Sequence, residues 1–448
     1  MEKRTKLVVL GGGPAGIQAT RMIKTQNPAW DVTMIRRERA SMVYCAIPYA
    51  LEGIIDREKV LKTDALVTDV GAELIRENAT EVNIQERWIK TESGQVIHFE
   101  YLFFVPGSKS WIPPVPGADL SGVLTVKTEE DMVAIEDRLN GGAGKAVVIG
   151  AGAIGLEQAM AYKTRGLDVH VIDLADRILP HMSDHEMSAP LQEELISKGI
   201  ILHLNQRLEA FIGDRHVTGI KMSQGEQIKL TSKMDFVVVA AGMKANLDLV
   251  EGQLEIGPDG VMVTPDMRTS VPYVFAAGDV VQGWSGIDGK PLGGRLATNA
   301  VPMAKVAAMN IMGGDIKYPG LFNGSATVVG NLRIGGTGFT ESFARSRGFD
   351  VMTATSETTS RFPMMPGATN VKVKLIADAK SGRIIGGQVT GTEAVAEKID
   401  VITLAIQQNM TSRQLSELSY SAQPWQTFFP AKNAIVEAAM TLTIAQES

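Results

Sequence analysis

The hydrophobic and polar positions of this chain follow one order twice. Residues 6–10 form a short aliphatic run that predicts a buried strand. After a glycine-rich loop, the apolar spacing predicts a helix that ends near Gln26, and residues 31–35 predict the next strand. The order strand, glycine loop, helix, strand is typical of a nucleotide-binding unit.

The second copy of this order begins 139 residues later in the chain. Residues 145–149 predict its first strand, residues 156–164 its helix and residues 168–173 its second strand. A repeat of the whole order predicts two similar units, each built on a parallel sheet.

The remaining segments close these units and then change in character. Residues 95–99 and 101–105 predict two strands of the first unit, and residues 235–242 predict a strand that closes the second unit. A further strand is predicted at residues 273–280, followed by a helix from Leu296 to about Met312.

The last third of the chain has a different pattern. Residues 325–395 alternate apolar and polar positions between glycine turns, which predicts an antiparallel sheet. Ile399, Ile402 and Ile406 then share one face of a helix. The pattern predicts an α+β terminal domain whose apolar faces serve its own core or an oligomer interface.

Composition and charge exclude several classes of protein. The chain has 448 residues and a formal net charge of −6, so nothing favours electrostatic binding to nucleic acid. No apolar run reaches the roughly 18 residues that a membrane span needs. A single cysteine excludes an internal disulfide and fits a reducing, cytoplasmic compartment.

Both glycine loops have the spacing G-x-G-x-x-G, in Gly11–Gly16 and again in Gly150–Gly155. The first glycine permits a tight turn, the second lets the backbone approach a pyrophosphate, and the third lets the helix pack on the strand. Two such loops indicate two dinucleotides, most simply FAD and NAD(P)H. The alternative is a pair of nucleotide folds that bind nothing.

The residue expected to bind each ribose differs between the two units. Asp173 ends the second strand of the second unit, where a carboxylate favours NADH over NADPH, although Arg177 lies near in sequence. The first unit has Arg36 at the matching place. Either Glu38 substitutes for the missing acid or the ribose is held in another way.

Cys45 lies in residues 41–50, shortly after the first nucleotide-binding unit's second strand. A cysteine without a partner is either a small buried hydrophobic residue or a reactive centre with one thiol. The two dinucleotide loops that flank this segment favour the reactive centre.

The order of these features resembles one superfamily across essentially the whole chain. The two glycine loops, the cysteine segment, Ala277-Gly278-Asp279 and the α+β terminal domain are together similar to the pyridine nucleotide–disulfide oxidoreductases. Ala50 stands where glutathione-reductase-like members carry a second cysteine. Residues 41–49 resemble instead the single-cysteine branch of coenzyme A disulfide reductases, NAD(P)H persulfide and polysulfide reductases, NADH peroxidases and NADH oxidases.

The resemblance implies a role for each matching residue. FAD would be held by Gly11, Gly13, Pro14, Ala15, Gly16, Glu38, Val82 near the adenine, Gly107, Asp279 at the ribityl chain, and Leu296 and Ala297 at the flavin ring. The pyridine nucleotide would be held by Gly150, Gly152, Ile154, Gly155, Asp173 and Gly242. The implied catalytic residues are Cys45, Glu157 between nicotinamide and flavin, and Tyr420, which would reach the partner's cysteine or else simply pack.

The function that the resemblance implies is reduction of disulfide, persulfide or polysulfide sulfur by NAD(P)H through FAD and Cys45. One alternative is an NADH oxidase or peroxidase that uses a cysteine sulfenic acid, although the first glycine loop lacks the histidine usual there. Another is a redox-sensing or electron-transfer flavoprotein with a structural cysteine. Coenzyme A is a further candidate ligand, but Met364 and Met365 stand where its reductases carry a second tyrosine.

We therefore expect an α/β enzyme that works as a cytoplasmic homodimer on a small sulfur compound, without metal, nucleic acid or membrane span. The predicted domains are residues 1–117 and 246–319 for FAD, residues 118–245 for NAD(P)H, and residues 320–448 for dimerisation.

Overall fold

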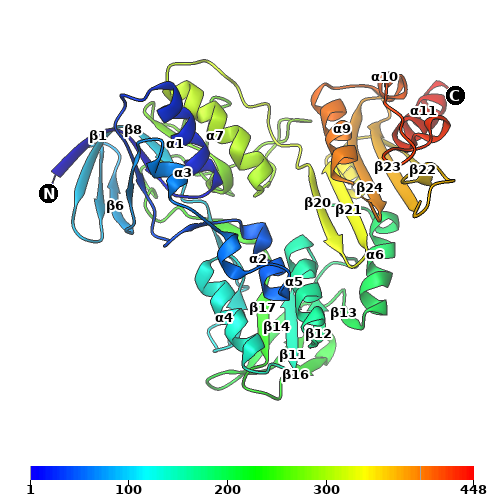
Figure 1. Ribbon diagram of the computed structural model, residues 1–448, viewed down its shortest axis with the longest axis horizontal. Coiled ribbons are helices and arrows are strands. Elements are labelled where there is room, and N and C mark those ends of the chain that lie inside the picture. Colours follow the sequence, from blue (N-terminus) through cyan, green and yellow to red (C-terminus); the bar gives the residue numbers. More distant parts are fainter. Residues whose placement is uncertain (1, 394) are drawn as a thin grey trace.

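The computed structural model describes residues 2–393 and 395–448. Its first unit is built on a seven-stranded sheet in the order β5-β2-β1-β8-β7-β6, with β19 also beside β8 (Figure 1). The strands are β1 (Glu2–Leu10), β2 (Val32–Ile35), β5 (Glu73–Ile75), β6 (Ala79–Asn83), β7 (Trp88–Thr91), β8 (Val96–Phe104) and β19 (Val274–Ala276). All neighbours are parallel except β6, β7 and β8, which form antiparallel pairs.

Strand β8 corrects the prediction of two separate strands at residues 95–99 and 101–105. It is one continuous strand that changes partner along one edge, where His98 is paired with Trp88 of β7 and Leu102 with Val274 of β19. Its first half is partly exposed and its second half is buried, so the hydrophobic pattern changes in the middle of the strand.

Two long helices cover the first sheet. Helix α1 (Pro14–Gln26) follows the first glycine loop, and α7 (Ala297–Ile311) returns from the distant part of the chain to pack against it. The helix predicted to end near Gln26 is confirmed as α1. The helix predicted from Leu296 to about Met312 is confirmed as α7, to within two residues at each end. A short helix, α3 (Ala65–Thr68), completes this unit.

The second unit repeats the design with a five-stranded parallel sheet in the order β10-β17-β11-β12-β13. The strands are β10 (Val123–Thr125), β11 (Lys145–Ile149), β12 (Asp168–Ile172), β13 (Ile200–His203) and β17 (Phe236–Val239). The helices are α4 (Glu129–Asn140), α5 (Ala153–Thr164) and α6 (His185–Ser197). The sequence pattern missed a small antiparallel sheet, β14 (Leu208–Gly213), β15 (Val217–Met222) and β16 (Gln227–Lys229).

The cysteine segment belongs to the first unit in sequence but packs on the second. It contains β3 (Ser41–Met42), paired with β4 (Leu61–Lys62), and helix α2 (Ile47–Glu52), which contacts α5. Ile47 and Leu51 are buried in the same apolar core as the second unit. A two-stranded ribbon of β9 (Ser108–Ser110) and β18 (Met243–Ala245) also joins the units. The predicted domain boundaries themselves stay predictions.

The third unit is the predicted antiparallel sheet, in the order β20-β21-β24-β23-β22. Its strands are β20 (Ser325–Val329), β21 (Leu332–Gly338), β22 (Val351–Thr359), β23 (Asn370–Asp378) and β24 (Ile384–Gly391). Its helices are α8 (Glu341–Ser346), α9 (Ala396–Gln407), α10 (Ser412–Ser416) and α11 (Ala434–Glu447). The three isoleucines predicted on one helix face are all buried in α9.

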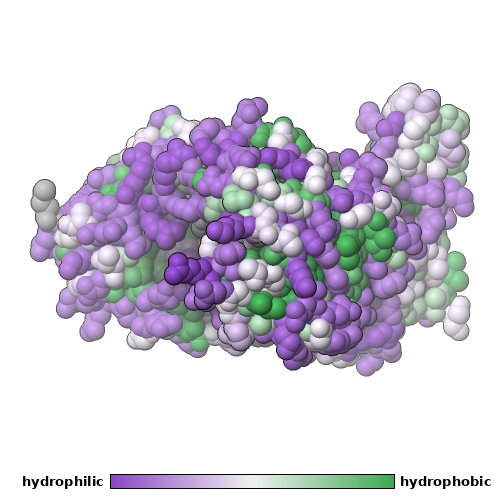
Figure 2. Space-filling view, turned by 90° about the horizontal axis from the view of Figure 1, so that it is seen from below, coloured by the Kyte–Doolittle hydropathy of each residue, from purple (hydrophilic) through white to green (hydrophobic). Residues whose placement is uncertain are grey.

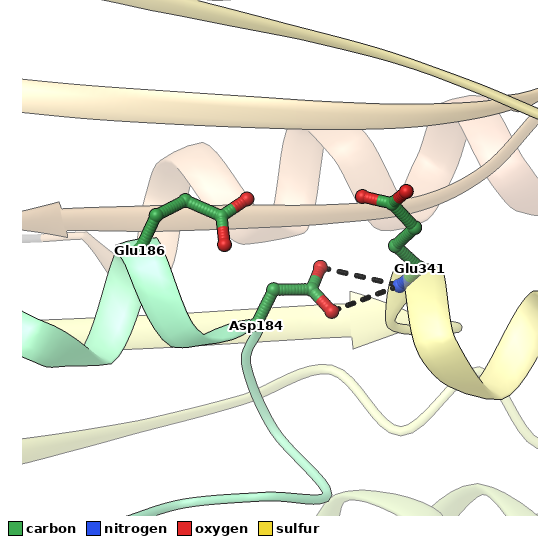
Figure 3. A group of neighbouring side chains, drawn as sticks. All are labelled: Asp184, Glu186 and Glu341. Atoms are coloured by element: carbon green, nitrogen blue, oxygen red, sulfur yellow. Dashed lines mark hydrogen bonds between the residues drawn. The ribbon is translucent and has the colours of Figure 1, made fainter. Parts of the chain in front are cut away.

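A buried lysine holds the third unit against the second. Lys374 of β23 is 2% exposed, and its ammonium pairs with Asp184 at 3.1 Å, with Glu341 at 2.9 Å and with Glu186. Figure 3 shows the three carboxylates converging, with both oxygens of Asp184 accepting from the backbone N–H of Glu341. These carboxylates could in principle bind a metal ion, but the lysine already supplies their cation.

The face in Figure 2 is mainly hydrophilic, with smaller apolar patches among the polar side chains. No helix within residues 2–393 and 395–448 combines the length and the apolar character that crossing a bilayer requires.

We predict that Lys374→Met lowers the free energy of unfolding by about 3 kcal/mol, because it leaves the buried carboxylate of Asp184 and the two more exposed carboxylates beside it without their cation. Chemical denaturation measures this loss. The control is Lys372→Met on the same strand, whose lysine pairs with Glu357 near the surface, and it should cost less than about 1 kcal/mol. Equal losses in the two variants would show that the Lys374 cluster does not hold the units together.

Candidate functional site

The first glycine loop is shaped by two close backbone approaches and one open position. A Cβ on Gly11 would lie 2.0 Å from the carbonyl oxygen of Val105, and a Cβ on Gly16 would lie 2.0 Å from that of Gly11. A Cβ on Gly13 would meet no atom within 4 Å. Gly13 therefore borders open space at the N-terminus of α1, where backbone N–H groups stabilise phosphate.

The second glycine loop has the same geometry. A Cβ on Gly150 would lie 2.5 Å from the carbonyl oxygen of Ala240, and one on Gly155 would lie 1.9 Å from that of Gly150. Gly152 again has no neighbouring atom within 4 Å. Both loops thus leave space for a pyrophosphate beside the middle glycine, so the residues present fit two dinucleotides.

Asp173 is placed beside the second loop, at the end of β12. Its Oδ2 accepts from the backbone N–H of Ala151 at 2.6 Å, and its Oδ1 accepts from that of Ala175 at 2.7 Å. Arg177 does not join it, because its guanidinium donates to Asp176 and to Ser342 Oγ of the third unit. The expected influence of Arg177 on this carboxylate therefore has no direct contact to support it.

Arg36 is a buried structural residue beneath the first loop. Its guanidinium donates to the carbonyls of Glu38 and Arg39 and to Asp64 Oδ1 at 2.8 Å. A Cβ on Gly12 would lie 2.3 Å from the Arg36 side chain. Arg36 thus fixes the path of the chain from residue 36 to 39 and leaves the Glu38 carboxylate partly exposed.

Cys45 is exposed, which excludes the interpretation as a small buried hydrophobic residue. It lies in a 3₁₀ turn, Tyr44–Ala46, that leads directly into α2. The apolar residues of α2 fix this turn to the second unit, while the thiol itself remains accessible. The structure thus holds a reactive type of side chain in a defined place.

Two ionisable residues share the surroundings of Cys45. Burial raises the pKa of Tyr49 on α2, and the charges of Glu157 and Cys45 raise it further. Glu157 lies on α5 behind the second glycine loop, where its Oε1 accepts from Thr327 Oγ1 of β20 at 2.6 Å. Burial also raises the pKa of Glu157, against the effect of the Thr327 hydrogen bond.

Asp279 follows β19 at the carboxyl edge of the first sheet. Its Oδ2 accepts from Ser108 Oγ at 2.7 Å and from the ammonium of Lys127 at 3.3 Å. The ring of Tyr44 lies 5.7 Å from the same ammonium. Ser108 and Lys127 were not found by sequence reasoning; the only local signal is the capping pattern Thr128-x-x-Asp131 after Lys127.

The other predicted cofactor residues lie on several elements. Leu296 is the N-cap residue of α7, but its side chain makes no capping hydrogen bond. Ala297 is the first residue of the helix and is exposed. Gly107 and Gly242 have positive φ angles of 72° and 126°, and neither would bring a Cβ against another atom. Val82 is buried in β6, and its carbonyl accepts from Gln253. Pro14, Ala15 and Ile154 lie in the first turns of α1 and α5.

Tyr420 is not brought to Cys45 of the same chain. It lies in the segment between α10 and α11, and Figure 1 shows both of these helices far from α2. Its side chain is 41% exposed, and its hydroxyl donates to the carbonyl of Pro430 at 2.7 Å. The fold and this site together define a two-dinucleotide enzyme with one accessible thiol.

Comparison with known proteins identifies the family. A family model described as pyridine nucleotide-disulphide oxidoreductase matches residues 5–304, and one described as the dimerisation domain of that family matches residues 325–427. The chain belongs to the pyridine nucleotide-disulphide oxidoreductase family, and it is an enzyme that uses FAD and NADH or NADPH.

Individual relatives cover nearly the whole chain. An NAD(P)H sulfur oxidoreductase (CoA-dependent) of Pyrococcus furiosus is 32% identical over 94% of this chain and 96% of its own. An NADH oxidase of Methanocaldococcus jannaschii is 30% identical over 94% and 95%. The solved structure of an NAD-dependent persulfide reductase from A. fulgidus has a TM-score of 0.93 and 29% identity, covering 100% of this chain and 84% of that one.

We predict that Glu157→Gln stabilises the protein more at neutral pH than in acid. Because the folded-state pKa of Glu157 is raised, its contribution to stability is present below its unfolded pKa of about 4.3 and is lost as the pH rises through the folded value. The variant's gain in melting temperature should therefore grow between about pH 4 and pH 7. The exposed Glu193→Gln is the control, and a gain that does not change with pH would contradict the prediction.

Proposed function

We propose that this enzyme uses NAD(P)H to reduce disulfide, persulfide or polysulfide sulfur through Cys45. The observation that carries the proposal is one exposed thiol, fixed by α2 against α5, the helix that follows the second glycine loop, in a chain that has no second cysteine. With no second thiol in the chain, the sulfur that pairs with Cys45 must come from the substrate.

The chemistry of Cys45 follows from thiol–disulfide exchange. The Cys45 thiolate attacks one sulfur of the substrate, an S–S bond forms to Cys45, and the substrate's own S–S bond breaks. The leaving thiolate takes a proton, and Cys45 is left in a mixed disulfide or a persulfide. A bound FAD would supply, from NAD(P)H, the two electrons with which this bond is converted back to the Cys45 thiolate and a reduced second sulfur.

The residues around the two loops would hold the cofactors. Gly13 and Gly152 leave room for the pyrophosphates, and the open first turn of α7 would face the flavin ring. Asp279 Oδ1 would accept a ribityl hydroxyl, and Asp173 would favour NADH over NADPH. Glu157, held by Thr327, would lie between the nicotinamide and the flavin.

Relatives of this chain support a thiol carrier as substrate. Two archaeal relatives are named as CoA-dependent sulfur oxidoreductases, and one as a coenzyme A polysulfide/persulfide reductase. Coenzyme A persulfide or disulfide is therefore the first substrate to test. Met364 is 70% exposed at the place where a second tyrosine is expected, so this part of the site differs from that pattern.

The active form would be a homodimer. The dimerisation-domain match covers residues 325–427, and Tyr420 and Trp425 are exposed in a segment without helix or strand. In a dimer this segment would reach the partner's Cys45. There the Tyr420 hydroxyl would donate a proton to the leaving thiolate.

We predict that Cys45→Ser abolishes NADH-dependent reduction of coenzyme A disulfide, coenzyme A persulfide and polysulfide under anaerobic conditions. Serine keeps the size of the side chain but cannot form the mixed disulfide. NADH oxidation at 340 nm measures each substrate in turn. The control is Ser41→Ala, which changes another residue of the same segment and leaves the Cys45 thiol in place. Wild-type rates in Cys45→Ser would show that Cys45 is not the relay.

The same assay separates the reductase from an oxidase. The relative from Methanocaldococcus jannaschii is named an NADH oxidase, so oxygen and hydrogen peroxide are tested beside the sulfur compounds. We expect the sulfur compounds to be turned over faster. A wild-type enzyme that turns over mainly oxygen would overturn the proposed sulfur substrate.

We predict that Tyr420→Phe lowers the rate of sulfur reduction about a hundredfold, because general acids typically contribute factors of this order. Mixed dimers test the partner's role. A dimer of one Cys45→Ser chain and one Tyr420→Phe chain keeps one site with both intact residues if they come from different chains, and no such site if they come from one chain. A mixed dimer with no more activity than either variant would contradict the arrangement.

A further inference from the structure

Lys127 brings a positive charge from the second unit to Asp279 of the first. It lies in the turn between β10 and α4, and its ammonium donates to Asp279 Oδ2 at 3.3 Å and to Ser108 Oγ at 2.6 Å. Ser108 Oγ donates in turn to the same Oδ2 at 2.7 Å. One oxygen of the carboxylate is thus held by two groups of the protein.

The turn that carries Lys127 is itself tightly held. Asp131 Oδ2 accepts from the backbone N–H groups of Lys127 at 2.8 Å and Thr128 at 3.0 Å, and its Oδ1 accepts from Thr125 Oγ1 at 2.8 Å. Thr128 Oγ1 accepts from the N–H of Asp131 and completes a capping box. The backbone at Lys127 is therefore fixed before its side chain reaches Asp279.

The surroundings of Lys127 favour a defined position of its ammonium. Its side chain is 17% exposed and that of Asp279 is 20% exposed. Burial lowers the pKa of Lys127, and the carboxylate of Asp279 offsets part of this effect. The Tyr44 ring lies 5.7 Å from the ammonium, within the range of a cation–π contact, and Tyr44 directly precedes Cys45.

The other oxygen of Asp279 is free. Oδ1 accepts no hydrogen bond from any residue of the described chain, whereas Oδ2 accepts two. A carboxylate with one oxygen bound inside the protein has its plane fixed, and its second oxygen then points in a set direction. That oxygen can accept a hydroxyl from a ligand.

We propose that Lys127 is a positioning residue for the flavin, which neutralises Asp279 through Oδ2 and leaves Oδ1 oriented toward a hydroxyl of the ribityl chain. The proposal rests on the assignment of Asp279 to the ribityl chain under the proposed function. It gives the second unit a direct part in the flavin site. By neutralising the Asp279 carboxylate, Lys127 also removes a negative charge that would oppose reduction of the flavin.

The test compares purified holoenzymes of wild type, Lys127→Met, Lys127→Arg and Asp279→Asn. The control is Lys109→Met on the neighbouring β9, which removes an exposed lysine that pairs with Asp248. Two quantities are measured: the rate at which FAD is released on dilution, and the midpoint potential of the bound flavin by equilibration with a reference dye.

We expect Lys127→Met to release FAD about tenfold faster, which corresponds to about 1.4 kcal/mol, because the substitution removes a charge-assisted hydrogen bond to Asp279. The flavin potential of Lys127→Met should shift to more negative values. Lys127→Arg, which keeps the charge, should have the wild-type potential, and so should Lys109→Met. If Lys127→Met keeps the wild-type rate of FAD release and the wild-type flavin potential while Asp279→Asn changes both, the role of Lys127 is overturned and the assignment of Asp279 stands. Wild-type values in Asp279→Asn would instead overturn the assignment of Asp279.

The double variant Lys127→Met with Asp279→Asn separates positioning from general destabilisation. If Lys127 acts through Asp279, its substitution has little further effect on the potential once the carboxylate is gone. A full additional shift in the double variant would overturn the proposal.

Discussion

The structure depends on one constraint: Cys45 is the only thiol in the chain. A disulfide reductase with two cysteines can hold two electrons as a dithiol and give them up by closing its own disulfide. Under the proposed function, a single thiol instead exchanges electrons through a bond to a sulfur of the substrate. The thiol must therefore be accessible and fixed at once. The exposed 3₁₀ turn at Cys45, with α2 buried in the second unit directly behind it, meets both requirements.

Polar contacts between the three units set the geometry around that thiol. Glu157 of the second unit accepts from Thr327 of the third, and Lys374 of the third unit gathers carboxylates from α6 and α8. Lys127 of the second unit reaches Asp279 of the first. Each contact is at least partly buried, so each carries more weight than an exposed ion pair would. One of them, from Lys127 to Asp279, joins the two units that carry the dinucleotide loops.

The sequence predicted the parts of the fold that have a strong local pattern. The two glycine loops, α1, α5, α7 and the antiparallel sheet were all evident from hydrophobic spacing, and the family resemblance supplied the candidate residues. What it missed depends on contacts between distant segments. The burial of Arg36 beneath Gly12, the change of partner along β8, and the convergence of Ser108, Lys127 and Asp279 leave no local pattern to detect.

The most direct test of the central claim is the intact mass of the enzyme after reaction with one equivalent of coenzyme A disulfide, without NADH. The account predicts one coenzyme A bound per chain, mapped by peptide mass to Cys45, and its release when NADH is added. An adduct on another residue, or an adduct on Cys45 that NADH cannot remove, would contradict the single-thiol relay, and the absence of any adduct would exclude coenzyme A disulfide as its substrate.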